Sequence, residues 1–314
     1  MIKFLVIGHL CVDVFGDKET PTTDELASAM HWGGIFFSLA TLANLADDAV
    51  IFPVFGVGTK EYEPFLERIR LYPNVDISGI FRLPGPTNKV YLRYENGEKR
   101  IECSKPIAPP IPFEKIEPYL KADAILVNMI SGFDVTVDTL SSLRMVTQPN
   151  QTFLHLDIHS LTLGVDGQHR RFPRPLETWR RWCYLADTVQ MNEEEAKVLP
   201  LEYLQEEGLA KQILSLGLRG FVLTRGARGV TAWAQEHKKI SRSDFPPVPV
   251  ENKVDPTGCG DVFAAAFCYH IARSHDVPAA ADFANRIASM NVGYVGSDGI
   301  DTISETRKRV EEAR

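Results

Sequence analysis

The stretch Asp255-Pro256-Thr257-Gly258-Cys259-Gly260-Asp261 decides how this chain is interpreted, because an apolar, alanine-rich run from Val262 to Phe267 follows it directly. That run has helical character, so the loop stands at a helix start, where several backbone N–H groups lack partners and the helix dipole is positive. Glycines there permit close approaches that a side chain blocks. The glycines and the helix start together are therefore predicted to form a cradle for an anion, most naturally a phosphate.

Asp261 stands beside this cradle and is the candidate base. A carboxylate is ionised at neutral pH and can take a proton. An anion hole beside a base is what the transfer of a phosphoryl group to a hydroxyl requires. A simpler interpretation stays open, because Asp-Pro-Thr-Gly is also a good turn and Asp or Thr is a good helix cap. Cys259 is either a small space-filling residue or a reactive thiol whose pKa the helix start lowers.

The composition is that of an ordinary globular protein. The 314 residues suffice for one large α/β domain, predicted as residues 1–314, and 44% are hydrophobic and 24% charged. A formal net charge of -7 argues against a general nucleic-acid binder, and no apolar run approaches a membrane span. The five cysteines are scattered without Cys-x-x-Cys spacing, so a disulfide scaffold or a zinc site is not expected. A reducing, cytoplasmic location is expected instead.

Strand and helix patterns alternate along most of the chain, which predicts a doubly wound, mostly parallel sheet with helices on both faces. Asp13 is expected in a loop after the first strand. Ligands in such sheets bind beyond the carboxyl ends of the strands. The predicted strands are 2–7, 50–55, 124–129, 153–157, 188–191 and 220–224, and the predicted helices are 35–45, 61–70, 201–216 and 279–291.

One region interrupts this alternation. Residues 88–103 alternate in polarity around Asn96-Gly97, which is a hairpin signal for half-exposed strands. We expect a small β lid formed mainly by residues 85–106.

Two further segments carry chemistry. Asn192 and Glu195 follow a buried strand three residues apart, and such oxygen ligands suit a hydrated Mg²⁺, although Asn is also a good helix N-cap and Glu favours a first turn. The turn from Thr224 to Gly229 either forms an ordinary hairpin or binds a nucleotide, with Thr224 and Gly226 near phosphates and Arg225 or Arg228 supplying charge.

Taken together, these segments resemble the ribokinase-like carbohydrate kinases, also called the phosphofructokinase B family. Residues 255–261 match the family's Asp-Thr-x-Gly-Ala-Gly-Asp signature, and 192–195 match its Asn-x-x-Glu motif. Residues 224–229 match its nucleotide-binding turn, and Gly33-Gly34 matches the paired glycines near its sugar site. The order and spacing agree across nearly the whole chain.

The resemblance implies a role for each site residue. Asp261 is implied as the base, and the amides of Gly258, Cys259 and Gly260 as the anion hole. The remaining implied contacts are Asn192 and Glu195 with Mg²⁺; Thr224, Gly226, Asn192 and Asn285 with ATP; Asp13, Gly33 and Gly34 with the hydroxyls of the acceptor; and Asp255, Thr257 and the Gly296-Ser297 turn with a monovalent cation such as K⁺. A homodimer formed through the lid is also expected.

The chain departs from the family pattern on the acceptor side. Phe37 and Ser38 stand where many relatives have an Asn, and Asp157-Ile158-His159-Ser160 replaces a common Asp-Pro-Asn-x-Arg segment. His155 and His159 are either pocket groups or structural histidines. The basic cluster 169–174, with Arg180 and Arg181 beyond it, is either a solvated surface or a site that recognises a phosphorylated or acidic acceptor.

These observations predict an ATP- and Mg²⁺-dependent kinase that phosphorylates a hydroxymethyl group of a sugar or nucleoside-like small molecule. The alternative is a catalytically silent protein of the same fold that binds a sugar or nucleotide. An NAD-dependent oxidoreductase fits less well, because Gly8-His9-Leu10-Cys11 lacks the glycine spacing of a dinucleotide turn.

Overall fold

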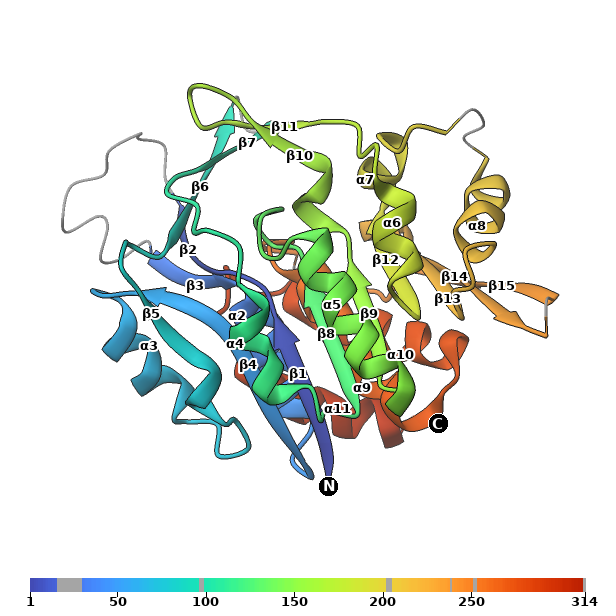
Figure 1. Cartoon of the computed structure of the whole chain (residues 1–314), viewed down its shortest axis with the longest axis horizontal. Helices are drawn as coiled ribbons and strands as arrows, with labels where there is room; N and C mark the ends of the chain where they lie inside the picture. The colour runs from blue at the N-terminus through green and yellow to red at the C-terminus, as the bar shows by residue number, and fades with distance from the viewer. Residues whose placement is uncertain (16–29, 96–98, 202–204, 238, 251–252, 313–314) are drawn as a thin grey trace.

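The computed structural model describes residues 1–15, 30–95, 99–201, 205–237, 239–250 and 253–312. Its centre is a sheet of nine strands: β1 (Ile2–Ile7), β4 (Ala49–Gly58), β5 (Ile80–Leu83), β8 (Ala124–Asn128), β9 (Phe153–Asp157), β12 (Thr188–Asn192), β13 (Gly220–Thr224), β14 (Val230–Glu236) and β15 (Lys239–Phe245). The strand order is β15-β14-β13-β12-β9-β8-β1-β4-β5 (Figure 1). All neighbouring strands run parallel except β13 with β14 and β14 with β15.

Helices cover both faces of this sheet, as Figure 1 shows. One layer holds α2 (Ile35–Leu45), α9 (Cys259–Ser274), α10 (Val277–Asn291) and α11 (Ile303–Glu312), and the other holds α4 (Phe113–Ile116), α5 (Val137–Thr147) and α6 (Trp179–Tyr184). The remaining α-helices of the described chain are α3 (Tyr62–Ile69), α7 (Glu193–Lys197) and α8 (Glu206–Leu214). Because both faces are covered, the central strands are continuously apolar, and Phe4, Leu5, Val6 and Ile7 are all fully buried.

A second, four-stranded sheet lies beyond the carboxyl ends of β1 and β4 (Figure 1). Its order is β3 (Met30–Gly34), β2 (Leu10–Phe15), β6 (Asn88–Glu95) and β7 (Lys99–Ser104). A two-stranded ribbon, β10 (Leu163–Val165) with β11 (Arg171–Pro173), joins β7 through a bridge between Cys103 and Arg170. These six strands form a roof over the end of the main sheet.

The roof differs from the lid expected at residues 85–106, because β2 and β3 also contribute to it. The expectation that Asp13 lies in a loop is wrong: Asp13 is within β2, which pairs antiparallel with β3 on one side and parallel with β6 on the other. Short-range sequence patterns do not reveal these pairings, which join segments far apart in the chain. The expected Asn96-Gly97 turn lies outside the described residues, and the number of domains stays a prediction.

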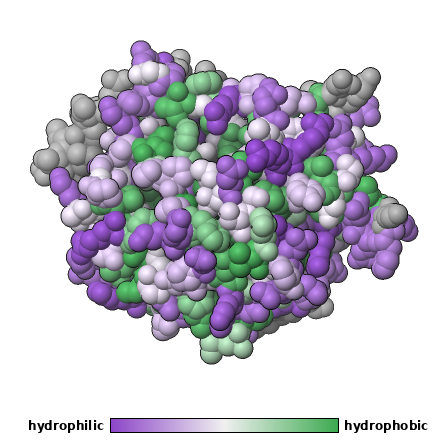
Figure 2. All heavy atoms as spheres, in the orientation of Figure 1, coloured by the Kyte–Doolittle hydropathy of each residue, from purple (hydrophilic) through white to green (hydrophobic). Residues whose placement is uncertain are grey.

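The helix expected at residues 201–216 is shorter in the structure, where α8 begins at Glu206 and ends at Leu214; residues 202–204 are not described. Hydrophilic and hydrophobic residues intermix over the face seen in Figure 2. None of the helices that the structure describes has the length and apolar character needed to cross a membrane.

Candidate active site

The glycine loop enters α9 through a backbone conformation that requires glycine. Gly258 precedes the helix with φ +78°, and a Cβ added there would lie 2.5 Å from the ring of Phe37. No side chain caps this helix. Asp255 instead accepts hydrogen bonds from the amide and hydroxyl of Thr257 at 2.9 and 2.7 Å and from the amide of Gly296 at 3.0 Å. The interpretation of Asp255 or Thr257 as a side-chain cap of this helix therefore fails. The same hydrogen bonds bring together Asp255, Thr257 and Gly296, the segments expected around a monovalent cation.

Cys259 behaves as a space-filling residue. Burial raises the pKa of its thiol to about 11, so the thiol stays protonated at neutral pH. Its amide donates to the carbonyl of Pro256 at 3.2 Å. An anion hole at this loop would therefore rest on the amides of Gly258 and Gly260 rather than on all three expected donors.

A cavity of about 330 Å³ opens beside the start of α9. Six of the residues predicted from the sequence line it, namely Thr224, Gly226, Asp255, Cys259, Gly260 and Asn285. Most of the other walls are apolar, and they include Ala227, Val230, Val248, Val250, Phe263, Ala288 and Val292. An apolar cavity with a glycine-rich, amide-bearing end suits a flat heterocycle that carries phosphates.

The charged residues near this cavity differ from those expected. Arg225 and Arg228 are not among its lining residues, and both form ion pairs with Glu193. Lys253 does line the cavity, although no motif in the sequence singled it out. Asn285 lies on α10, where its side chain donates to the carbonyl of Pro246 at 2.9 Å.

Asn192 and Glu195 form a capping box at the start of α7. The amide of Glu195 donates to the side chain of Asn192 at 2.9 Å, and the carboxylate of Glu195 accepts from the amide of Asn192 at 2.8 Å. The capping alternative is therefore realised in the structure. It leaves room for a metal role, because Asn192 is exposed at the carboxyl end of β12 and pairs in register with Thr224 of the cavity.

The carboxyl groups of Asp157, Glu195 and Asp261 lie close enough together to interact electrostatically. Burial raises the pKa of Asp157 well above its ordinary value, and the charges of Glu195 and Asp261 raise it further. Burial also raises the pKa of Glu195. The Nε2 atom of Gln190 donates both to Asp157 at 3.2 Å and to the carbonyl of Gly260 at 3.1 Å, which ties the group to the glycine loop. Such crowding of carboxyl groups is where a cation would be favoured.

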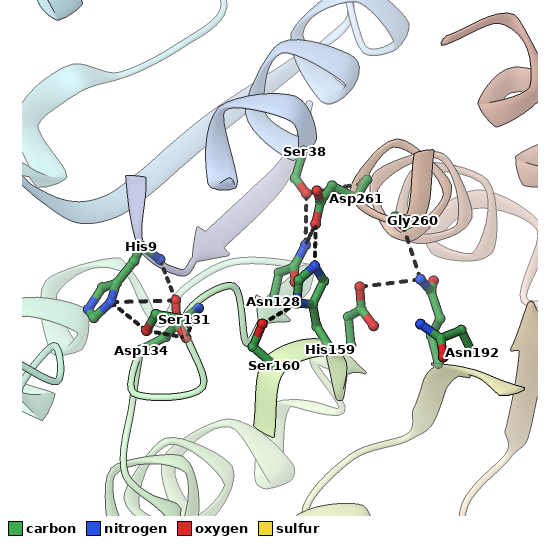
Figure 3. Close-up of polar contacts among 12 residues, drawn as sticks. His9, Ser38, Asn128, Ser131, Asp134, His159, Ser160, Asn192, Gly260 and Asp261 are labelled. Carbon is green, nitrogen blue, oxygen red and sulfur yellow. Dashed lines mark hydrogen bonds and ion pairs between the residues drawn. The ribbon is translucent and has the colours of Figure 1, made fainter. Parts of the chain in front are cut away.

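Asp261 lies in the first turn of α9, nearly buried, and its carboxylate is held from the main sheet (Figure 3). The Nδ2 atom of Asn128 donates to its Oδ1 atom at 2.8 Å, and the Nε2 atom of His159 lies 3.8 Å from the same oxygen. Ser38 also holds the backbone of Asp261, because the hydroxyl of Ser38 donates to the backbone carbonyl of Asp261 at 3.1 Å. The candidate base is thus contacted from the end of strand β8, from the segment after β9 and from helix α2.

Asn128 and His159 were not assigned to the site from the sequence. Asn128 ends a buried strand, as Asn192 does, so the same criterion would have found it. His159 stood between two interpretations, and the structure brings it to the site. His155 is structural, since its ring contacts Thr188 at 2.8 Å and burial lowers its pKa to about 3.

The residues expected to contact the acceptor lie between the roof and the end of the main sheet. Asp13 is nearly buried, and a Cβ on Gly33 would lie 2.0 Å from its carboxylate, so glycine is needed there to admit Asp13. Gly34 begins α2 with φ +58°. Phe37 is buried against Gly258, so the position where relatives carry an amide is filled by an aromatic ring.

The basic cluster is only partly a solvated surface. Arg170, Arg174, Arg180 and Arg181 are exposed. Arg171 differs, because its side chain is 2% exposed, donates to the carbonyl of Ser131 at 2.8 Å and lies 3.9 Å from Glu102 of the roof. Arg171 therefore joins the roof to the loop after β8.

Known carbohydrate and nucleoside kinases are similar in sequence to this chain. The model of the pfkB family of carbohydrate kinases matches residues 164–303. Ribokinase from Bacillus subtilis is 38% identical over 121 residues, which is 38% of this chain and 37% of that protein. Cytidine kinase from Thermococcus kodakarensis is 27% identical over 280 residues, which is 85% of this chain and 87% of that protein.

Solved structures give the same picture at the level of the fold. Ribokinase from Thermotoga maritima superimposes with a TM-score of 0.75 at 18% identity, over 99% of both chains. A pyrophosphate-dependent kinase in the ribokinase family, complexed with a pyrophosphate analog and myo-inositol, gives 0.72 at 19% identity, over 94% of this chain and 96% of that one. The predicted fold class and the predicted resemblance to the ribokinase-like family are confirmed.

Proposed function

We propose that this chain, which resembles the ribokinase-like carbohydrate kinases, transfers the γ-phosphoryl group of ATP to a hydroxymethyl group of a sugar or nucleoside-like small molecule. Kinase relatives support a phosphotransferase in general terms. One observation carries the proposal: the 330 Å³ cavity ends at the glycine loop, where Asp261 is held by Asn128 at 2.8 Å.

The proposed reaction assigns a step to each part of this arrangement. The carboxylate of Asp261 accepts the proton of the acceptor hydroxyl as that oxygen attacks the γ-phosphorus of ATP. A bond forms between the acceptor oxygen and the γ-phosphorus, the bond from the γ-phosphorus to the bridging oxygen of the β-phosphate breaks, and ADP leaves. The amides of Gly258 and Gly260 stabilise charge on the transferred group. Asp13, Gly33 and Gly34 orient the acceptor, because phosphoryl transfer depends mostly on positioning and on neutralising charge.

The shape of the cavity supports a nucleotide as the phosphoryl donor. A pyrophosphate donor has no apolar part to occupy walls such as Val230, Val250 and Phe263. An adenine ring has such a part, and its transfer from water into an apolar cavity lowers the free energy of binding. Asn285 and Thr224 offer polar groups at the edge of this cavity.

The residues at the end of β12 fit a magnesium ion held through water. Among the described residues no group of three or more His, Cys, Asp or Glu side chains is placed to hold a metal directly. Hydrated Mg²⁺ needs only one or two protein oxygens and the substrate phosphates, and Asn192 and Glu195 supply such oxygens beside a crowded carboxyl group, Asp157. A bound Mg²⁺ would neutralise charge on the phosphate oxygens.

The test is formation of the phosphorylated acceptor over a matrix of donors and acceptors, with ADP release followed for ATP and phosphate release followed for pyrophosphate. ATP and pyrophosphate are each combined with D-ribose, cytidine and myo-inositol, with and without Mg²⁺. We expect turnover with ATP, Mg²⁺ and at least one hydroxymethyl acceptor. The alternative, a silent binding protein, predicts that ATP binds in equilibrium titration but that no acceptor is phosphorylated with either donor. Turnover with pyrophosphate alone would overturn the assignment of the donor.

A further inference from the structure

His159 lies where the chain departs from its relatives, and it faces the candidate base. Its Nε2 atom is 3.8 Å from Oδ1 of Asp261, the oxygen that also accepts from Asn128 (Figure 3). The side chain is 33% exposed, whereas that of Asp261 is 8% exposed, so the imidazole lies on the open side of the carboxylate. A distance of 3.8 Å is too long for a hydrogen bond, but catalytic contacts commonly tighten when substrate binds.

Ser160 orients the ring of His159. The hydroxyl of Ser160 lies 2.8 Å from Nδ1 of the imidazole. A neutral imidazole carries one hydrogen, and the partner of one ring nitrogen decides which nitrogen carries it. When the hydroxyl donates to Nδ1, the hydrogen lies on Nε2 and faces Asp261. In that tautomer the pair presents an N–H donor, rather than a lone pair, to the carboxylate.

The backbone around His159 is held in an uncommon conformation. His159 has φ +38°, a value that few residues other than glycine adopt. Two hydrogen bonds fix it: the hydroxyl of Thr162 donates to the carbonyl of His159 at 3.0 Å, and the amide of Ser160 donates to the carbonyl of Met129 at 3.0 Å. Strain of this kind persists where the surrounding structure enforces it, and it gathers at functional sites.

We propose that His159 is a positioning residue for Asp261, with Ser160 setting its tautomer. In the proposed kinase reaction, Nε2–H of His159 and the amide of Asn128 donate to the same oxygen of Asp261. These two donors fix the plane of the carboxylate that accepts the proton from the acceptor hydroxyl. The proposal rests on the proposed function, and it names a residue that takes the place of an Asn common in the family.

Two variants of similar size separate the contact with Asp261 from the rest of the ring. In His159→Asn the side-chain amide reaches only the position of Nδ1, so the bond to Ser160 survives and the contact with Asp261 is lost. In His159→Gln the amide nitrogen reaches the position of Nε2. We expect His159→Asn to lower kcat about tenfold with the KM of ATP and of the acceptor within about twofold, and His159→Gln to stay within about threefold of wild type.

The best acceptor of the panel is the probe, and a double-mutant cycle isolates the coupling. In the Asp261→Asn background, His159→Asn should lower single-turnover rates by no more than about twofold, because its partner is already absent. A loss of equal size in both backgrounds, or an equal loss in His159→Gln and His159→Asn, would overturn the proposal.

A second readout needs no acceptor and so separates failure of this proposal from failure of the proposed function. Imidazole ¹⁵N signals of His159 are assigned by their loss in His159→Asn. We expect the hydrogen on Nε2, a shift of the Nε2 signal in Asp261→Asn, and a shift of the Nδ1 signal in Ser160→Ala. A hydrogen on Nδ1 in the wild type, or signals that Asp261→Asn leaves unmoved, would refute the assignment.

Discussion

The two halves of the candidate site differ in how closely they follow the family pattern. The donor half, formed by β13, β14, α9 and α10, keeps the matching motifs and holds a formed cavity of about 330 Å³. The acceptor half, formed by the roof, α2 and the segment after β9, departs from the pattern at Phe37, Ser38 and His159.

The structure shows where these departures lead. Phe37 and Ser38 turn toward α9, where Phe37 packs on Gly258 and Ser38 donates to the carbonyl of Asp261. His159 faces the carboxylate of Asp261. The altered residues therefore contact Asp261 and the glycine loop. Under the proposed function they support the candidate base, and the acceptor contacts differ from the family pattern.

Asp261 joins the two halves, and its substitution has the largest expected effect. Asp261→Asn keeps the shape and a hydrogen-bonding group but removes the base, so kcat should fall by about 10³-fold or more while the Kd of ATP changes by less than about threefold. Steady-state kinetics and nucleotide titration measure the two quantities. Turnover near that of wild type would show that another group accepts the proton.

Gly258 tests the packing of the acceptor half against the donor loop. Gly258→Ala places a methyl group against the ring of Phe37 at φ +78°, so unfolding free energy should fall by about 2 to 4 kcal/mol from strain and overpacking together. Denaturant or thermal unfolding measures it. Gly260→Ala is the matched control, because no atom lies within 4 Å of the added Cβ, and its change should stay below about 0.5 kcal/mol. Equal losses in both variants would contradict this explanation.

Ala288 tests the donor half alone. It lies on α10 and lines the apolar cavity, so Ala288→Phe fills space that the adenine ring would occupy and should raise the KM of ATP about tenfold, with little change for the acceptor. Ser289→Ala, which lines the same cavity without filling it, serves as the control. If Ala288→Phe instead raised the KM of the acceptor, the two halves would be assigned the wrong way round.

Asp157 lies between the halves and gives the smallest effect, one that depends on pH. Its pKa is raised in the folded state, so folding favours the protonated form, and stability is lost as pH rises from the ordinary carboxyl range toward the raised pKa. Asp157→Asn has no charge to bury. Its Tm should exceed that of wild type by about 2 °C at pH 8, and by less at pH 4. Thermal unfolding at the two pH values measures this difference in Tm. A larger increase in Tm at pH 4 than at pH 8 would contradict a raised pKa of Asp157 in the folded state.

Local sequence patterns predict the parallel core of the main sheet but not its outer strands β5 and β15. Continuous apolar runs such as Ile2–Ile7 correspond to strands buried on both faces, and the glycine loop before an alanine-rich run corresponds to the start of α9. The roof was only half predicted. Leu10–Phe15 is a strand because β3 and β6 pair with it, and those partners are not neighbours in the sequence pattern.

The candidate site divides in the same way. The sequence alone predicted the fold class, from the alternation of strand and helix patterns along the chain. It also singled out the glycine loop as the candidate anion site and Asp261 as the candidate base, because both depend on residue types at short spacing. Only the tertiary structure decided what surrounds Asp261. Ser38 comes from helix α2 and donates to the backbone carbonyl of Asp261. Asn128 and His159 approach the carboxylate of Asp261, because Asn128 ends β8, His159 follows β9, and neighbouring parallel strands end at a common edge of the sheet.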